Sequence, residues 1–237
     1  MHRLLLILNI LNVGLAYSLP VPAIIDAKMQ AEMASPMSGI IAKVPFREGQ
    51  IFKKSQDIII FKCEKQLSEQ DKEKAVLNKK NIVYQGYKRL KELKSISKIE
   101  LIEAKSDYLE AKALWQIASH KVNDCFVKAP FDGQIIKLYI NEHEHIDIGK
   151  PLLDIVSFDD LEIKIIAPSS WLTWIKEGIN FKVEVQETGR VYQAIVLRYN
   201  HYVDPVSRTF SIFGKFINKP KGVVPGMSGQ AIFKEAI

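Results

Sequence analysis

Few residues in this sequence have the types and spacing that chemistry requires. It contains no Ser, His and Asp in a recognisable catalytic order, no GxSxG motif and no glycine-rich phosphate loop. No pair of carboxylates supports an acid–base mechanism either. The sequence therefore predicts a protein that is not an enzyme.

Metal binding is the main chemical alternative. In the segment NEHEHID, His143 and His145 are two residues apart and would share one face of a strand, where imidazoles can hold a metal ion. Met29, Met33 and Met37 recur at four-residue spacing. Two histidines make an incomplete site, however, and Met37 lies in the turn SPMSG. We expect a solvated turn and no metal site, with periplasmic metal binding or delivery as an alternative function.

The first 18 residues, MHRLLLILNILNVGLAYS, have the pattern of a secretory signal peptide. The apolar run is too short to span a bilayer comfortably, and no cysteine follows it that could carry a lipid anchor. We expect cleavage after Ser18 and export from the cytosol. In such a compartment the only two cysteines, Cys63 and Cys125, can form a disulfide.

Composition places the chain among globular proteins. Its 237 residues are 47% hydrophobic and 25% charged, with a net charge of +6. Lys and Arg are interpreted as spread among acidic residues, on a solvated surface of mixed charge. No nucleic-acid recognition motif is present, so no nucleic-acid partner is predicted.

One 26-residue pattern occurs twice. Residues 36–61 and 130–155 align without a gap at a constant offset of 94, with Gly39 on Gly133 and Glu48 on Glu142. Alternating apolar residues and turn residues predict about four short strands in each copy. Two copies are too few for a solenoid, so they are read as two halves of one domain, separated by an insertion.

The insertion, residues 63–125, has a helical composition without proline. Ser97 with Glu100 predicts a capping box that begins a second helix, and the tip of a hairpin falls near residues 94–96. Cys63 and Cys125 are equidistant from residue 94, so an antiparallel hairpin brings them together at its base. An apolar heptad seam runs along each predicted arm: Leu101, Ala104, Tyr108, Ala111, Trp115, Ala118 and Val122 in the second arm, and Val76, Val83, Tyr87, Leu90 and Leu93 in the first.

The C-terminal part alternates strand patterns with turns and predicts a small β-barrel. PSSWLTWIKEG reads as a short helix with a Ser cap and a Gly stop, whose Trp171 and Trp174 cap the barrel core. Asp204 and Arg208 are assigned to turn chemistry. The fold class is α+β, mainly β, and the predicted division is: signal peptide 1–18, linker and first barrel strand 19–33, repeat half 34–62, hairpin 63–125, repeat half 126–157, barrel 158–237.

This order of parts resembles the periplasmic adaptor proteins (membrane fusion proteins) of the HlyD family, especially adaptors of RND-type efflux pumps. The motifs that carry the resemblance are SPMSGIIAKVPFREGQ, VKAPFDGQIIKLYINEHEHIDIGKPLLDI, VDPVSRTF and PGMSGQAIF. It implies a split lipoyl-like domain and a periplasmic protein that links an inner-membrane transporter to a TolC-like outer-membrane channel, usually as a homo-oligomeric ring. A type I (ABC) secretion adaptor is the alternative within this class, although such adaptors usually keep an uncleaved membrane anchor.

In this family an Arg, a Leu four residues on and a Ser seven further mark the tip that meets the channel. Here Arg89 and Leu93 match, but Ser97 follows after only four residues. The resemblance therefore assigns Arg89, Leu93 and Ser97 to channel contact at a shortened tip. Lipoyl-like domains elsewhere carry a cofactor on a lysine at the hairpin between the two halves. Here the long insertion replaces that hairpin, and no cofactor is expected. The membrane-proximal domain of many RND adaptors is also not recognisable.

Overall fold

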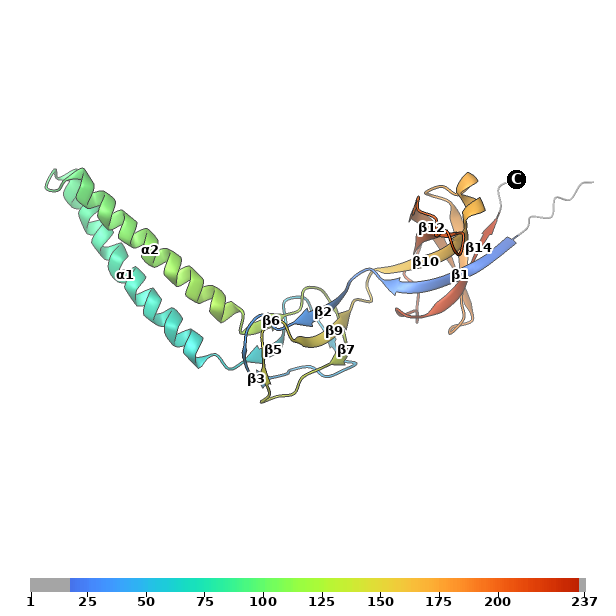
Figure 1. Ribbon diagram of the computed structural model, residues 1–237, viewed down its shortest axis with the longest axis horizontal. Helices are drawn as coiled ribbons and strands as arrows, with labels where there is room; N and C mark the ends of the chain where they lie inside the picture. The colour runs from blue at the N-terminus through green and yellow to red at the C-terminus, as the bar shows by residue number, and fades with distance from the viewer. Residues whose placement is uncertain (1–17, 235–237) are drawn as a thin grey trace, which may run out of the picture. The chain divides into compact units, whose positions relative to one another are not determined.

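The computed structural model describes residues 18–234, so residues 1–17 of the predicted signal peptide 1–18 lie outside the described part. The described chain forms two compact units (Figure 1). One unit contains residues 18–28 together with residues 160–234. The other is Met29–Asp159. No helix among residues 18–234 is long and apolar enough to cross a membrane.

The two repeat halves form the lipoyl-like domain, two four-stranded sheets that each combine strands of both halves. The sheet orders are β2-β9-β7-β4 and β6-β5-β3-β8. Adding 94 to the residue numbers of β2 to β5 gives the positions of β6 to β9 and converts one sheet order into the other. The duplication in sequence is therefore an approximate two-fold symmetry in space. The strands are β2 (Gln30–Ala34), β3 (Gly39–Lys43), β4 (Ile51–Phe52), β5 (Asp57–Phe61), β6 (Phe126–Lys128), β7 (Gly133–Leu138), β8 (His145–Ile146) and β9 (Pro151–Val156).

Reciprocal hydrogen bonds join the halves and explain why the repeated glutamates recur. A carboxylate oxygen of Glu48 accepts from the backbone N–H of Leu138 at 2.7 Å. At the symmetric place, Glu142 accepts from the N–H of Val44 at 2.9 Å. Because each half satisfies a backbone donor of the other, neither half has a complete set of partners alone.

The predicted domain boundary after residue 33 was wrong for one segment. Gln30–Met33 was assigned to the linker and first barrel strand, but β2 pairs with β9 in the lipoyl-like domain. The barrel strand β1 ends earlier, at Ala27. The alternation of apolar residues continues through both strands, so the sequence pattern alone does not show where the chain passes from one unit to the other.

The insertion is an antiparallel hairpin of α1 (Glu64–Glu92) and α2 (Lys98–Asn123). The predicted seam of α2 is present: Ala104, Ala111, Ala118 and Val122 are buried. In contrast, α1 has no fully buried residue. The predicted seam positions Val83, Leu90 and Leu93 are exposed, whereas Val76 and Tyr87 are partly buried.

Polar and aromatic contacts set the rotation of α1 instead. Tyr84 stacks on Tyr108 with ring centroids 5.6 Å apart. Lys80 Nζ lies 2.6 Å from an Asp107 carboxylate oxygen, and the Gln70 amide donates to the Ser119 hydroxyl at 3.1 Å. The α1 sequence has few apolar residues, so periodicity alone misplaced its inner face.

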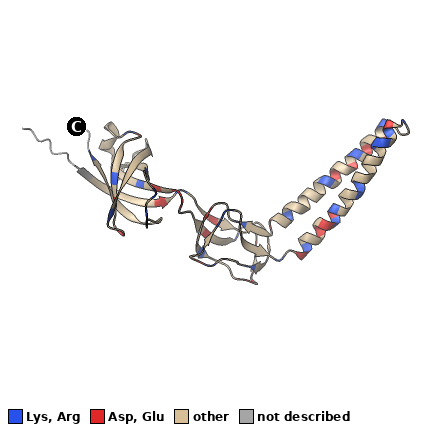
Figure 2. Ribbon diagram, turned by 180° about the vertical axis from the view of Figure 1, so that it is seen from behind, with Lys and Arg blue, Asp and Glu red and all other residues tan. Residues whose placement is uncertain are grey.

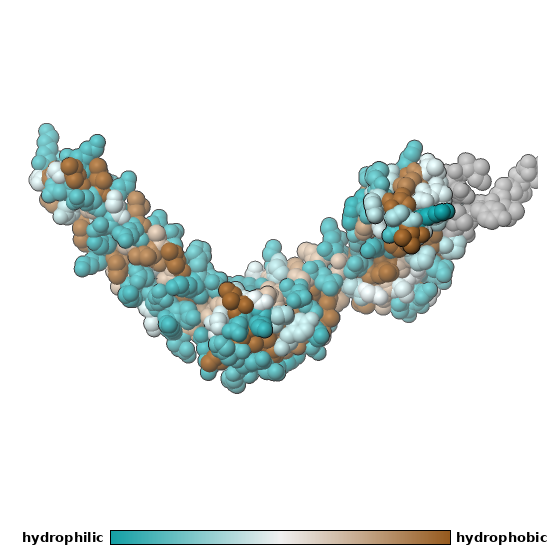
Figure 3. All heavy atoms as spheres, viewed as in Figure 1, coloured by the Kyte–Doolittle hydropathy of each residue, from teal (hydrophilic) through white to brown (hydrophobic). Residues whose placement is uncertain are grey.

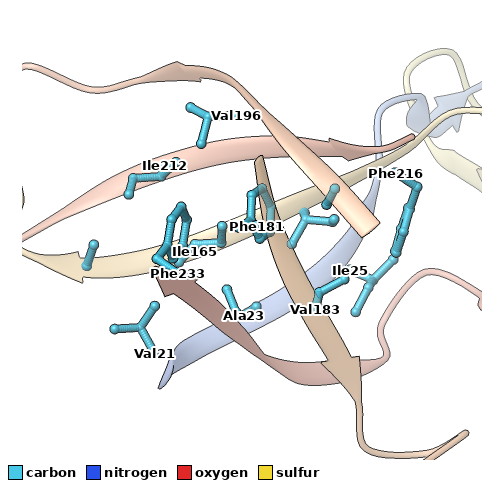
Figure 4. Close-up of a cluster of buried hydrophobic side chains, with 14 of the residues drawn as sticks. Val21, Ala23, Ile25, Ile165, Phe181, Val183, Val196, Ile212, Phe216 and Phe233 are labelled. Carbon is cyan, nitrogen blue, oxygen red and sulfur yellow. The ribbon is translucent and has the colours of Figure 1, made fainter. Parts of the chain in front are cut away.

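The C-terminal unit is a closed six-stranded barrel in the order β1-β10-β13-β12-β11-β14. Its interior is filled by aliphatic and aromatic side chains (Figure 4), with Phe181 stacked on Phe233 at a centroid distance of 4.8 Å. The strands are β1 (Ser18–Ala27), β10 (Leu161–Pro168), β11 (Asn180–Val185), β12 (Arg190–Tyr199), β13 (Thr209–Phe216) and β14 (Ser228–Lys234).

The short helix predicted in PSSWLTWIKEG is a five-residue 3-10 helix, η1 (Ser169–Thr173). The predicted Ser cap is absent, because Pro168 occupies the cap position and no side chain caps the helix. Trp171 is buried, and its ring packs edge-on against Phe233 at 5.2 Å. Trp174 contacts the same rings, so the pair covers the barrel core as predicted.

Candidate docking site at the hairpin tip

The tip of the hairpin is a tight turn held by backbone hydrogen bonds. After α1 ends, Lys94 adopts a left-handed conformation with φ 56°. Its N–H donates to the Lys91 carbonyl at 3.0 Å, and the Ser95 N–H donates to the Leu90 carbonyl at 2.9 Å. This pair of bonds is a Schellman motif, which satisfies the last carbonyls of a helix.

The second helix begins with the predicted capping box. The Glu100 N–H donates to the Ser97 hydroxyl at 3.1 Å, and the Ser97 N–H donates to a Glu100 carboxylate oxygen at 2.7 Å. Both hydrogen bonds lower the pKa of Glu100, and the bond from the Ser97 backbone has the larger effect. Ser97 therefore has a structural role at this tip, whatever else it contacts.

Arg89 and Leu93 are displayed on the hairpin surface. They are four residues apart, so they lie on the same side of the helix. Both side chains are exposed, Leu93 at 72%. Within residues 18–234 the Arg89 guanidinium has no ion-pair partner. Because neither side chain supports the packing of the hairpin, both are available to a partner.

The base of the hairpin is closed by the predicted disulfide. Cys63 immediately precedes α1 and Cys125 follows α2, and they are joined with their Cα atoms 6.2 Å apart. Both cysteines are buried within the core of the lipoyl-like domain. The Phe61 N–H also donates to the Cys125 carbonyl at 2.9 Å. The hairpin is thus anchored to the domain from which it projects.

The two histidines do not share a strand face, because His143 lies in a turn and His145 lies in β8. His143 has φ 69° and occupies the position aligned with Gly49, whose φ is 80°. His143 is therefore part of a turn. His145 is exposed, and its Nε2 atom lies 3.3 Å from the Ser38 hydroxyl and 3.7 Å from an Asp147 carboxylate oxygen. No group of three or more His, Cys, Asp or Glu side chains in the described part of the chain could hold a metal ion.

The turn at Asp204 is also local structure. Its carboxylate accepts from the Val206 and Ser207 N–H groups at 2.9 and 2.8 Å, and the Ser207 bonds lower the pKa of Asp204. Arg208 follows with φ 54°. These contacts match the turn chemistry that the sequence predicted.

No family model matches the sequence. The chain is 22% identical over 243 residues to the solvent efflux pump periplasmic linker SrpA of Pseudomonas putida, covering 94% of this chain and 63% of SrpA. It is also 22% identical to the toluene efflux pump periplasmic linker protein TtgG of the same species, covering 94% of this chain and 61% of that protein. The chain therefore spans about three fifths of the length of these curated relatives.

Solved structures share the fold. A putative efflux transporter from Bacteroides eggerthii has a TM-score of 0.73 at 22% identity, over 92% of this chain and 69% of that one. A MacA–MexA chimera containing the Pseudomonas aeruginosa MexA α-hairpin domain has a TM-score of 0.81 at 18% identity, over 94% and 82%. The membrane fusion protein Spr0693 of Streptococcus pneumoniae R6 has 0.72 at 12%, over 92% and 100%.

The fold is that of the periplasmic adaptors, or membrane fusion proteins. In this chain, the lipoyl-like domain with its inserted hairpin and the small barrel make up the part that aligns with these structures. The relatives are named as efflux linkers and not as enzymes, in agreement with the prediction from the sequence.

Proposed function

We propose that this protein is the periplasmic adaptor of a tripartite efflux system. In this role it links an inner-membrane transporter to a TolC-like outer-membrane channel. The observation that carries the proposal is the hairpin, which is closed by a disulfide at its base and a hydrogen-bonded turn at its tip, and displays Arg89 and Leu93 there. The motif resemblance favours an RND transporter over a type I secretion system. Export by a cleaved signal peptide is part of the proposal.

We also propose a homo-oligomeric ring. The face of α2 opposite its seam carries large exposed apolar side chains with helical spacing, a pattern that protein partners cover. The exposed fractions of these side chains range from 50% to 68%: Ile99, Ile102, Leu109 and Ile117.

The tip supplies the test of channel docking. Arg89→Glu and Leu93→Asp should abolish efflux of a fluorescent substrate in a strain that lacks the native gene. Melting temperature and helicity should stay nearly unchanged, because both side chains lie outside the packing of the hairpin.

Matched controls lie at the base of the same helix. Lys65→Glu and Leu67→Asp make the same chemical changes at exposed positions and should preserve efflux. Normal efflux in both tip variants would show that this tip does not receive a channel in the manner the family implies.

A further inference from the structure

Positive charge is concentrated toward the tip of the hairpin, over residues 74–112, which are 39 of its 63 residues. Residues 74–112 contain ten basic and five acidic residues, a net charge of +5 compared with +6 for the whole chain. The first ten residues of α1, 64–73, have a net charge of −2. Figure 2 shows basic positions along the hairpin with acidic positions among them, and the excess of basic residues follows from the sequence. The stretch 74–98 contains one acidic residue, Glu92, and eight basic residues: Lys74, Lys79, Lys80, Lys88, Arg89, Lys91, Lys94 and Lys98.

Most of this charge is not neutralised within the described chain. Among these eight residues only Lys80 makes an ion pair, with Asp107 at 2.6 Å. Lys79, Lys88 and Lys98 are exposed and have no ion pair among residues 18–234. Like charges repel one another, so an accumulation of positive charge destabilises the free hairpin unless an anionic partner offsets it.

Apolar side chains lie among the basic ones. Ile82 and Leu93 are both 72% exposed, and apolar residues are visible on the hairpin surface (Figure 3). Arg89 is seven residues after Ile82 and four before Leu93, so the three share one face of α1. Gly86 is on α1 between them, with open space where a Cβ would lie.

This mixture fits a protein surface better than a membrane. A helix that lies on anionic lipid separates its basic face from its apolar face. Here the guanidinium is on the apolar face itself, as at protein interfaces, where arginine and apolar anchors occur together.

We propose that the surface that receives the hairpin is an acidic protein surface with an apolar pocket, at the periplasmic end of the outer-membrane channel. This inference rests on the proposed adaptor function and adds the chemistry of the partner. The distal basic residues would steer the hairpin to the channel and set the salt dependence of docking, while Leu93 and Ile82 would anchor it.

The experiment measures association of the full exported protein with a purified, immobilised TolC-like channel from the same bacterium. Lys79→Glu, Lys88→Glu and Lys98→Glu are combined in one variant. Lys164→Glu, Lys182→Glu and Lys215→Glu, at exposed positions of barrel strands, form a control with the same change in net charge. Between about 50 and about 300 mM salt, the association rate of the unmodified protein should fall at least about tenfold. The distal variant should associate at least about tenfold more slowly at low salt and lose this dependence, whereas the barrel variant should keep it.

Any one of the following results would overturn the proposal. Salt-independent association, or equal losses in both variants, would show that the distal charges do not steer docking. Binding of the unmodified but not the distal variant to vesicles with about 30% phosphatidylglycerol, without binding to the channel, would assign the surface to lipid. If the distal variant loses only self-association, the basic surface binds a second copy of this chain. Tight but salt-independent channel binding would contradict the acidic docking surface and agree with the adaptor function. The lack of channel binding at any salt concentration would contradict both proposals.

Discussion

At the residue scale, two glycines aligned by the 94-residue offset have different constraints. A Cβ on Gly133 would overlap the Val156 carbonyl group, which is fixed backbone of the neighbouring strand. A Cβ on Gly39 would lie 3.2 Å from Met37 Cε, the movable end of a flexible side chain. Both halves of the repeat have glycine at this position, but only at Gly133 does the neighbouring backbone exclude a side chain.

This difference predicts unequal effects of the same substitution. Gly133→Ala should destabilise the lipoyl-like domain by about 1–3 kcal/mol, because the backbone must shift to relieve the overlap. Gly39→Ala should cost much less. Chemical denaturation of both variants tests this, and equal midpoints would contradict it.

Lys94 provides a second residue-scale prediction. A residue with a side chain is strained at φ 56°, whereas glycine adopts this conformation freely. Lys94→Gly should therefore stabilise the hairpin by about 0.5–1 kcal/mol, measured as slower amide exchange in α1 and α2.

Lys94→Ala is the control, because it removes the charge and keeps the Cβ. If the alanine variant is stabilised as much as the glycine variant, charge repulsion and not backbone strain is the cause.

At the element scale, the two helices of the hairpin contribute unequally to its packing. The α2 helix contributes small buried alanines, but α1 contributes no buried side chain. Several inter-arm contacts are polar and partly solvent-exposed, and such contacts stabilise weakly. The disulfide at the base is therefore important for keeping the arms together.

Replacing both cysteines by alanine should loosen the hairpin more than the rest of the chain. On the chain-entropy model, a disulfide that closes a loop of 62 residues stabilises by about 4 kcal/mol. Amide exchange in α1 and α2 should become faster in Cys63→Ala/Cys125→Ala, while strands β10 to β14 serve as the internal reference. Unchanged protection of the helices would show that their packing suffices without the crosslink.

At the scale of the whole molecule, the outward face of α2 is the surface that a ring would cover. Its apolar residues belong to no core in the described chain. Exposed aliphatic side chains at this spacing are typical of helices that pack against other helices.

Ile102→Asp with Leu109→Asp should weaken self-association at least about tenfold without lowering the melting temperature, because both side chains are about half exposed. Analytical ultracentrifugation over a concentration series measures this. Val191→Asp with Ile217→Asp, at exposed positions of the barrel unit, is the matched control. Equal weakening by both pairs, or by neither, would argue against this face as the ring interface.

The sequence by itself determined the features that depend on local pattern. The 94-residue repeat, the capping box at Ser97 and Glu100, the α2 seam and the pairing of Cys63 with Cys125 follow from spacing, which local geometry translates directly into structure. Only the tertiary structure decided which side of α1 faces inward, because polar contacts such as Lys80 with Asp107 carry no apolar period. It also decided that β2 joins β9 and not the barrel, since an alternating strand fits either sheet until its partner is present.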